Sequence, residues 1–193
     1  MSLILASNSQ IRRTMLEQAG VEFAVRAPDF DENQAKQAHS LDGEKLARLL
    51  AEGKAASVTV GPNDWVIGSD SIVIVDGVRY SKPRDRDEAA AHLRAFSSRT
   101  MLLSSAVALA GGGHVDWTHA ETARLEVRPM SENFIQAYLD AEWPAVGLCV
   151  GVFRMEGRGV TLFESVEGSH FTILGMPLLP LLGALRARGV LQS

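Results

Sequence analysis

The stretch WVIGSDSIVIVDGVRYSKPRD, residues 65–85, organises the rest of the chain. Residues 65–67 form a short apolar run that favours a strand, and a second, β-branched run follows four small or polar residues. Asp76-Gly77 predicts a two-residue hairpin turn, because type I′ turns need positive φ at both central positions. The stretch therefore predicts a strand pair that returns antiparallel over residues 78–80.

Asp70 lies between the two apolar runs, and Lys82 follows the returning strand. An ionised carboxylate in apolar surroundings is costly unless it is paired, hydrogen-bonded or bound to a metal. One interpretation has both side chains facing one pocket, with Lys82 supplying charge for phosphate and Asp70 serving as a base or metal ligand. The other is that Asp70 only caps or bends the end of a strand. The spacing favours neither interpretation.

Length and composition place the chain among globular proteins. Its 193 residues suit one domain or two lobes that share a core, and 46% hydrophobic with 22% charged residues is an ordinary balance. The net charge of −4 argues against a general nucleic-acid binder, although it does not exclude a local phosphate site.

The only cysteine, Cys149, excludes an intrachain disulfide. The N-terminus lacks the basic and long apolar regions of a signal peptide, and no run reaches the length of a membrane span. We therefore expect a cytoplasmic protein without a membrane partner.

The N-terminal segment has the order strand, small polar loop, helix. Residues 3–6 predict a buried strand, Ser7-Asn8-Ser9 a loop, and residues 10–19 a helix that stops at Gly20. N–H groups at such a helix start favour anions. Arg12 in the first turn opposes the helix dipole. A bound phosphate would explain it; the alternative is a solvated or acid-paired arginine.

The acidic loop at residues 28–32, PDFDE, has three carboxylates that could help to bind a divalent cation. A solvated loop or a helix N-cap is the alternative. Further helices are predicted over residues 43–57, 85–96, 131–141 and 177–188. Further strands are predicted over residues 21–27, 100–110, 117–127, 149–153 and 160–163, the third following the second through a glycine turn.

Several well-known catalytic motifs are missing. The sequence contains neither GxGxxG at a strand–helix junction, nor a Walker GxxxxGK[ST], nor a GxSxG elbow. The five histidines do not pair at a zinc-ligand spacing, and Cys149 suits a buried small hydrophobe. Nucleophilic and zinc chemistry are therefore weakly supported.

Four segments in order resemble the Maf family of nucleoside triphosphate pyrophosphatases nearly end to end. They are LILASNSQIRRTMLEQAGVEF, the acidic PDFDE, GSDSIVIVDG with SKPRDRDEA, and VGVFRMEGRGVTLFESVEGSHFTILGMPL. The resemblance implies one α/β domain over residues 1–193, with two lobes around a central cleft and a long mixed β-sheet flanked by helices. It also implies hydrolysis of a nucleoside triphosphate to the monophosphate and pyrophosphate with Mg²⁺ or Mn²⁺, and is compatible with a homodimer.

Matching motif by motif gives expected site residues. Asp70 falls on the catalytic aspartate, and Glu32 on an acidic position that would share a metal with it. The phosphate-side positions are Ser7, Ser9, Arg12, Lys54 and Lys82.

The departures from the family pattern concern the base. Gln10 stands where the family usually has a proline. Family members that act on dTTP and UTP have other residues at the positions of Ile11, Glu156 and Leu148-Cys149. These features resemble the 7-methyl-GTP pyrophosphatase branch, although an aromatic residue is frequent there in place of Ile11. A carboxylate at position 156 can accept hydrogen bonds from N1–H and N2 of guanine. Ile11, Ser71 and Glu156 are thus expected to select the base, unless Glu156 only pairs with a nearby arginine.

Two other function classes fit the same resemblance. One is a nucleotide-sensing regulator of cell division with little turnover, against which the retention of Asp70, Lys54 and Lys82 argues. The other is a different phosphohydrolase, such as a monophosphatase, which would release orthophosphate.

Overall fold

The computed structural model describes residues 1–38 and 42–192. The chain separates into two compact units. Unit 1 comprises Met1–Ser71, Ser104–Glu121 and Ser169–Ser193, and unit 2 comprises Ile72–Leu103 and Thr122–Gly168.

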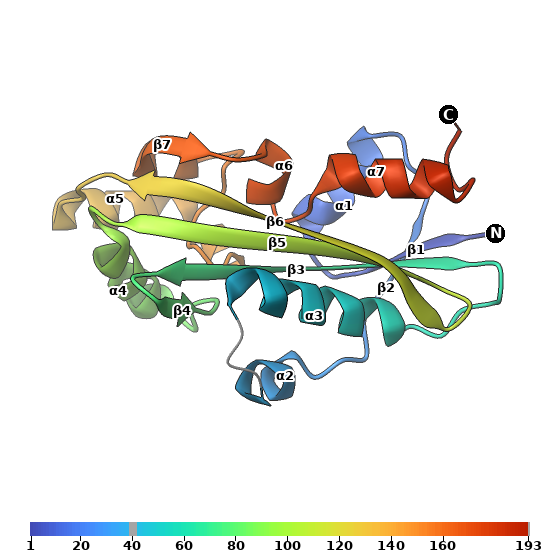
Figure 1. The fold of residues 1–193 in the computed structure, drawn as a ribbon. Helices are drawn as coiled ribbons and strands as arrows, with labels where there is room; N and C mark the ends of the chain where they lie inside the picture. Colours follow the sequence, from blue (N-terminus) through green and yellow to red (C-terminus); the bar gives the residue numbers. More distant parts are fainter. Residues whose placement is uncertain (39–41, 193) are drawn as a thin grey trace. The chain divides into compact units, whose positions relative to one another are not determined.

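The strands form a mixed sheet with the order β2-β1-β3-β5-β6-β7, in which β4 also pairs with β3. Three long strands contribute to both units: β3 (Trp65–Val75), β5 (Thr100–Gly111) and β6 (His114–Val127). The expected α/β class with a long mixed sheet and flanking helices is confirmed (Figure 1).

Unit 1 combines parallel strands with helices. Its other elements are β1 (Leu3–Ala6), α1 (Gln10–Gln18), β2 (Ala24–Arg26), α2 (Glu32–Ala38), α3 (Gly43–Ala56), α6 (His170–Ile173) and α7 (Leu178–Ala187). β1 runs parallel to both β2 and β3.

The two faces of these strands are covered by different helices. Leu5 and Ile67 are paired across β1 and β3, and both join a buried cluster with Leu16 of α1 and Leu181 of α7. Successive side chains in a strand point to opposite faces. Gly68 therefore faces the other way, against α3, which runs alongside β3 in unit 1 (Figure 1).

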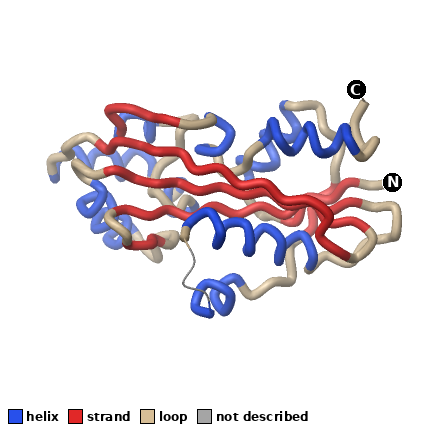
Figure 2. Tube along the Cα trace, in the orientation of Figure 1, coloured by secondary structure: helices blue, strands red, loops and turns tan. Residues whose placement is uncertain are grey.

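Unit 2 is built around the ends of the long strands. Its other elements are β4 (Val78–Tyr80), α4 (Arg86–Phe96), α5 (Glu132–Glu142), two 3₁₀ turns (Ala145–Leu148 and Arg158–Leu162) and β7 (Phe163–Glu167). Helices α4 and α5 pack against each other (Figure 2). The predicted hairpin is present, because Asp76 and Gly77 have φ values of 50° and 76° and β4 pairs antiparallel with β3.

The structure corrects several predicted elements. β3 is one continuous strand, so Asp70 lies inside it rather than between two strands. Residues 149–153 do not form a strand, and residues 160–162 belong to a 3₁₀ turn that precedes β7. The polar helix α2 was not predicted, and β2 is shorter than expected. No helix in the described residues is long and apolar enough to cross a membrane.

Candidate active site

Strand alternation sorts the polar residues at the centre of β3 onto two faces. A Cβ atom at Gly68 would lie 2.1 Å from the carbonyl oxygen of Ala51, so this face of β3 lies directly against α3. Asp70, two residues further, shares that face. Ser69 and Ser71 face the opposite side, toward α1 and the turn at Gly175.

Asp70 is buried, with a relative exposure of 7%. Its two carboxylate oxygens have different environments. Oδ1 accepts a hydrogen bond from the backbone N–H of Ser71 at 2.8 Å and lies 3.4 Å from Nζ of Lys54. Oδ2 is buried and has no hydrogen-bond partner among the described residues. Unsatisfied buried polar atoms are rare and commonly mark a site for water, an ion or a catalytic role. Oδ2 is therefore the atom of Asp70 whose hydrogen-bonding capacity the described residues leave unused.

Lys54 links Asp70 to Glu32. Its Nζ lies 2.8 Å from Oε1 of Glu32, and Oε2 of Glu32 lies 3.1 Å from Nζ of Lys36. Burial alone raises the pKa of Glu32, but the two lysines outweigh it and hold the pKa at about 2. Glu32 is therefore ionised at neutral pH, and one buried ammonium is shared between two carboxylates.

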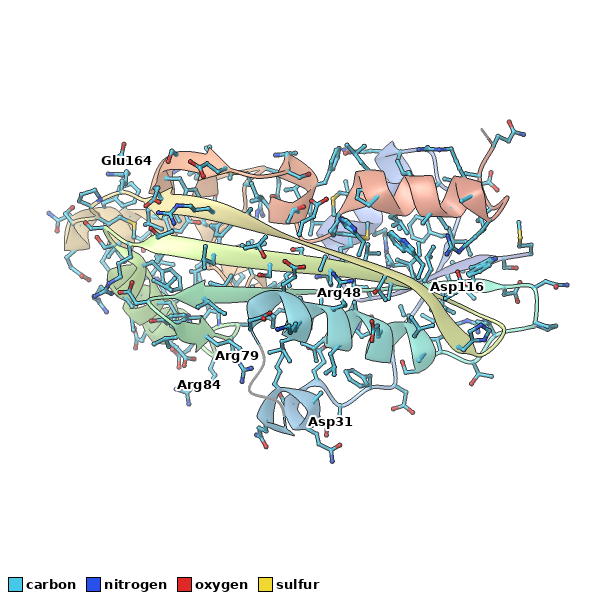
Figure 3. The ribbon with its side chains drawn as sticks, viewed as in Figure 1. Asp31, Arg48, Arg79, Arg84, Asp116 and Glu164 are labelled. Carbon is cyan, nitrogen blue, oxygen red and sulfur yellow. The ribbon has the colours of Figure 1, made fainter. Side chains whose placement is uncertain are left out.

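A glycine on α3 brings Glu32 to Lys54. A Cβ atom at Gly53 would lie 2.4 Å from the ring of Phe30, so the ring rests directly on the helix beside Lys54. Asp31 accepts a hydrogen bond from the backbone N–H of Gln34 and caps α2, at which it lies in Figure 3. The acidic loop thus supplies one helix cap and, through Glu32, one site carboxylate.

Arg12 is buried in the first turn of α1 and is bonded to protein acceptors. Its Nε donates to the carbonyl oxygen of Gly175 at 2.9 Å, and Nη1 donates to that of Ser69 at 2.9 Å. Nη1 also contacts Oγ of Ser7 at 3.4 Å, and Nη2 contacts Oγ of Ser71 at 3.1 Å. Burial lowers the pKa of Arg12, and the charge of Asp70 acts against that shift.

The loop before α1 lies next to this arginine. Oγ of Ser7 accepts a hydrogen bond from the backbone N–H of Ser9 at 3.2 Å. Ser9 is the N-cap of α1, but its side chain makes no capping bond. Ile11 is half-buried in the first turn. The structure thus brings Ser7, Ser9 and Arg12 together at the start of one helix.

The structure contains a chain of hydrogen-bonded hydroxyl groups that the sequence does not predict. Oγ of Ser71 lies 2.9 Å from Oγ of Ser105, which donates to the carbonyl oxygen of Thr172 at 2.7 Å. Thr172 in turn donates its hydroxyl to Glu121. The one available signal was the alternation of Ser69 and Ser71 inside a strand, and their partners lie far away in sequence.

Lys82 and Glu156 belong to unit 2, whereas Asp70 belongs to unit 1. Lys82 is exposed and lies two residues after the end of β4. Glu156 is exposed, and its Oε1 lies 3.7 Å from Nε of Arg154, which also lies 3.9 Å from Glu142. The pairing of Glu156 with an arginine, expected as one alternative, is therefore present. Cys149 is half-buried rather than buried. Burial and the charge of Glu156 raise the pKa of its thiol, which argues against a nucleophile.

One carboxylate oxygen, Oδ2 of Asp70, fits a divalent cation that is shared with a substrate. Among the described residues, no group of three or more His, Cys, Asp and Glu side chains could hold a metal ion. Mg²⁺ often uses only one or two protein carboxylates together with substrate phosphates and water. Oδ2 of Asp70 fits that pattern, while both oxygens of Glu32 are already in ion pairs with Lys36 and Lys54.

Comparison with known proteins matches the whole chain to one family. The family model described as Maf, Maf-like protein, matches residues 2–188. The nucleoside triphosphate pyrophosphatase of Gluconobacter oxydans is 42% identical over 100% of this chain and 97% of that protein. The 7-methyl-GTP pyrophosphatase of Rhizobium meliloti is 43% identical over 99% and 98%, and the nucleoside triphosphate pyrophosphatase of Paramagnetospirillum magneticum is 44% identical over 97% and 99%. The chain belongs to the Maf family.

Proposed function

We propose that the protein hydrolyses a nucleoside triphosphate to the nucleoside monophosphate and pyrophosphate. The observation that carries the proposal is the buried carboxylate of Asp70, with one oxygen held by Ser71 N–H beside Lys54 and the other without a partner in the described residues. Relatives that are more than 40% identical over nearly their whole length carry the name of this activity.

Asp70 is the proposed catalytic residue. Oδ2 accepts a hydrogen bond from a water molecule and orients or deprotonates it for in-line attack, which we assign to the α-phosphorus. The contacts at Oδ1 with the backbone N–H of Ser71 and with Nζ of Lys54 fix the plane of the carboxylate. Catalysis is then mainly positioning and electrostatic stabilisation.

The triphosphate is proposed to bind at the start of α1 through Ser7 and Ser9, with Lys54 and Lys82 as its cationic partners. Arg12 adds positive charge at the same helix start, while four of its N–H donors are bonded to the protein. A Mg²⁺ or Mn²⁺ ion bound at Asp70, with Glu32 as its second candidate ligand, would neutralise charge on the phosphates. Lys54 and Lys36 occupy Glu32 in the free protein, so recruitment of Glu32 requires at least one of these ion pairs to open. Removal of divalent cations with EDTA is expected to stop turnover, and added Mg²⁺ or Mn²⁺ to restore it.

For the base we propose a guanine, with 7-methyl-GTP as the preferred substrate. A relative at 43% identity is named for that nucleotide, whereas others carry the general name. Glu156 would accept hydrogen bonds from the guanine edge, which requires its contact with Arg154 to leave one carboxylate oxygen free. Ile11 and Ser71 are the other proposed determinants of base preference.

The test is product analysis of the purified protein with dTTP, UTP, CTP, GTP and 7-methyl-GTP in the presence of Mg²⁺ or Mn²⁺. Monophosphate and pyrophosphate in equal amounts support the proposal, and the fastest nucleotide tests the base preference. Orthophosphate as the first product would contradict it and indicate a different phosphohydrolase, one that removes the terminal phosphate and leaves the diphosphate. Tight binding without turnover of any nucleotide would also contradict it, in favour of a nucleotide sensor.

A further inference from the structure

We propose that Arg12 is a positioning residue, which holds the Asp70 segment of β3 in place instead of contacting the triphosphate. The inference deepens the proposed function and rests on it for the meaning of Asp70. It rests on the contacts of the Arg12 guanidinium, all of which lie within unit 1.

The donors of Arg12 are almost fully used by the protein. A guanidinium group has five N–H donors. Four contacts account for four of them: the carbonyl oxygens of Gly175 and Ser69 and the hydroxyl oxygens of Ser7 and Ser71. One donor is left, so the bidentate grip by which arginine usually recognises a phosphate is not available without breaking these bonds.

The contacts join three separate segments of the chain. Arg12 comes from α1, Ser69 and Ser71 come from β3, and Gly175 comes from the turn before α7. The pairing of β1 with β3 ends at Ala6 and Gly68, and Arg12 binds the carbonyl group of the very next residue of β3. The arginine thus continues the support of β3 where its neighbouring strand stops.

This support acts on both sides of Asp70. The carbonyl group of Ser69 precedes Asp70, and the hydroxyl group of Ser71 follows it. The backbone N–H of Ser71 is also the donor that holds Oδ1 of Asp70. Side chains alternate along a strand, so Arg12 works from the face opposite the one on which Asp70 meets Lys54.

The hydroxyl groups of Ser71 and Ser105 extend the same hydrogen-bond network. Ser105 donates to the carbonyl oxygen of Thr172, so its Oγ can accept from Ser71. The carbonyl oxygen of Gly175 accepts from Arg12 and from Ser69 and lies 3.2 Å from Oγ of Ser71. Oγ of Ser105 lies 2.9 Å from Oγ of Ser71, so Ser105 is the closer and less occupied acceptor for the Ser71 hydroxyl. Donation therefore runs in one direction, from Arg12 through Ser71 and Ser105 to the backbone of α6.

Gly175 is adapted to this role. Its φ of +107° lies in a region that side chains rarely adopt, and a Cβ atom there would lie 3.3 Å from Oγ of Ser71. Its carbonyl oxygen accepts hydrogen bonds from Nε of Arg12 and from the hydroxyl group of Ser69. The turn before α7 is therefore shaped around the arginine network.

The test is Arg12→Lys, with Arg13→Lys on the same helix as the matched control. A lysine keeps the charge and can still attract a phosphate, but one ammonium group cannot span acceptors on three segments. We expect kcat to fall on the order of 10- to 100-fold, with KM for the nucleotide and the dissociation constant of pyrophosphate within about twofold of wild type. Arg13→Lys should leave all three unchanged.

Two further measurements keep the outcomes separate. Hydrogen–deuterium exchange of residues 69–71 should accelerate in Arg12→Lys but not in Arg13→Lys, and this readout, like pyrophosphate binding, does not depend on turnover. A wild-type protein without activity would thus count against the proposed function. The positioning role of Arg12 would then be decided by hydrogen–deuterium exchange and by pyrophosphate binding. If Arg12→Lys does not fold, Ser105→Ala, which does not touch Arg12, should lower kcat in the same direction with KM unchanged. Weakened pyrophosphate binding with unchanged exchange in Arg12→Lys, or an unchanged kcat in Ser105→Ala, would overturn the inference.

Discussion

The ammonium nitrogen of Lys54 lies 3.4 Å from Oδ1 of Asp70, while Oδ2 of the same carboxylate is buried without a hydrogen-bond partner in the described residues. One oxygen is fixed by the protein, and the other is the atom to which we assign the proposed chemistry. Gly68 makes this arrangement possible, because the lack of a side chain there lets α3, which carries Lys54, lie directly against β3.

Asp70→Asn tests the catalytic carboxylate. An amide has nearly the same shape but is a poor base, so kcat should fall by at least about 100-fold while the fold is kept. Steady-state kinetics together with thermal unfolding check both parts. Asp76→Asn is the matched control, since an asparagine suits the same type I′ turn and the exposed pair of Asp76 with Arg99 contributes little. Comparable loss in both variants, or full activity in Asp70→Asn, would remove Asp70 from the role.

Lys54→Gln tests the shared ammonium group. It leaves the carboxylates of Asp70 and Glu32 without their common cation, so the free energy of unfolding should fall by about 1–3 kcal/mol, and kcat/KM should also fall. Lys36→Gln removes only the outer partner of Glu32 and should cost about 0–1 kcal/mol. Urea titration and kinetics of the two variants check the difference. Equal effects would argue against a special role for Lys54.

Acid stability tests the ion pairs of Glu32. Its pKa is lowered from 4.5 to about 2 in the folded protein, so its ionised form adds stability that is fully present above about pH 4.5 and is lost as the pH falls toward 2. Glu32→Gln should therefore be less stable than wild type at neutral pH, and the difference should shrink across this window. Urea midpoints measured at several pH values give the difference directly. Two parallel curves would be inconsistent with the lowered pKa.

Glu156→Gln tests base selection. A glutamine offers both a donor and an acceptor, so the ratio of kcat/KM for 7-methyl-GTP over UTP should fall by about 10-fold or more. Glu164→Gln is the control, because Glu164 is an exposed residue of β7 in the same unit (Figure 3). A nucleotide panel measured with both variants decides; an unchanged profile in Glu156→Gln would exclude the residue as a selector.

Much of the fold was predictable because local signals agree with tertiary structure. The Asp76-Gly77 turn, the helix stop at Gly20 and the Ser131 cap of α5 all occur as expected. The errors arise where packing overrides local signals. Gly68 suggests a break in a strand, but it is retained in β3 because α3 leaves no room for a side chain.

The candidate site was predicted only in part. Strand and loop patterns singled out Asp70, Arg12 and the acidic loop that contains Glu32, and the family resemblance added Lys54 and selected Glu32 within that loop. The contacts of Arg12 could not be deduced, because its acceptors at Ser69 and Gly175 lie 57 and 163 residues away in sequence. Such long-range contacts leave no periodic pattern in the sequence.

The most direct test of the account is a hydrolysis reaction in ¹⁸O-labelled water with Mg²⁺ or Mn²⁺ and the preferred nucleoside triphosphate, run with wild type and with Asp70→Asn. Attack of an Asp70-oriented water on the α-phosphorus predicts that the label enters the nucleoside monophosphate, that the pyrophosphate stays unlabelled, and that both products are lost in the variant. Label in pyrophosphate or in orthophosphate would contradict the account, because the water would then attack a different phosphorus atom.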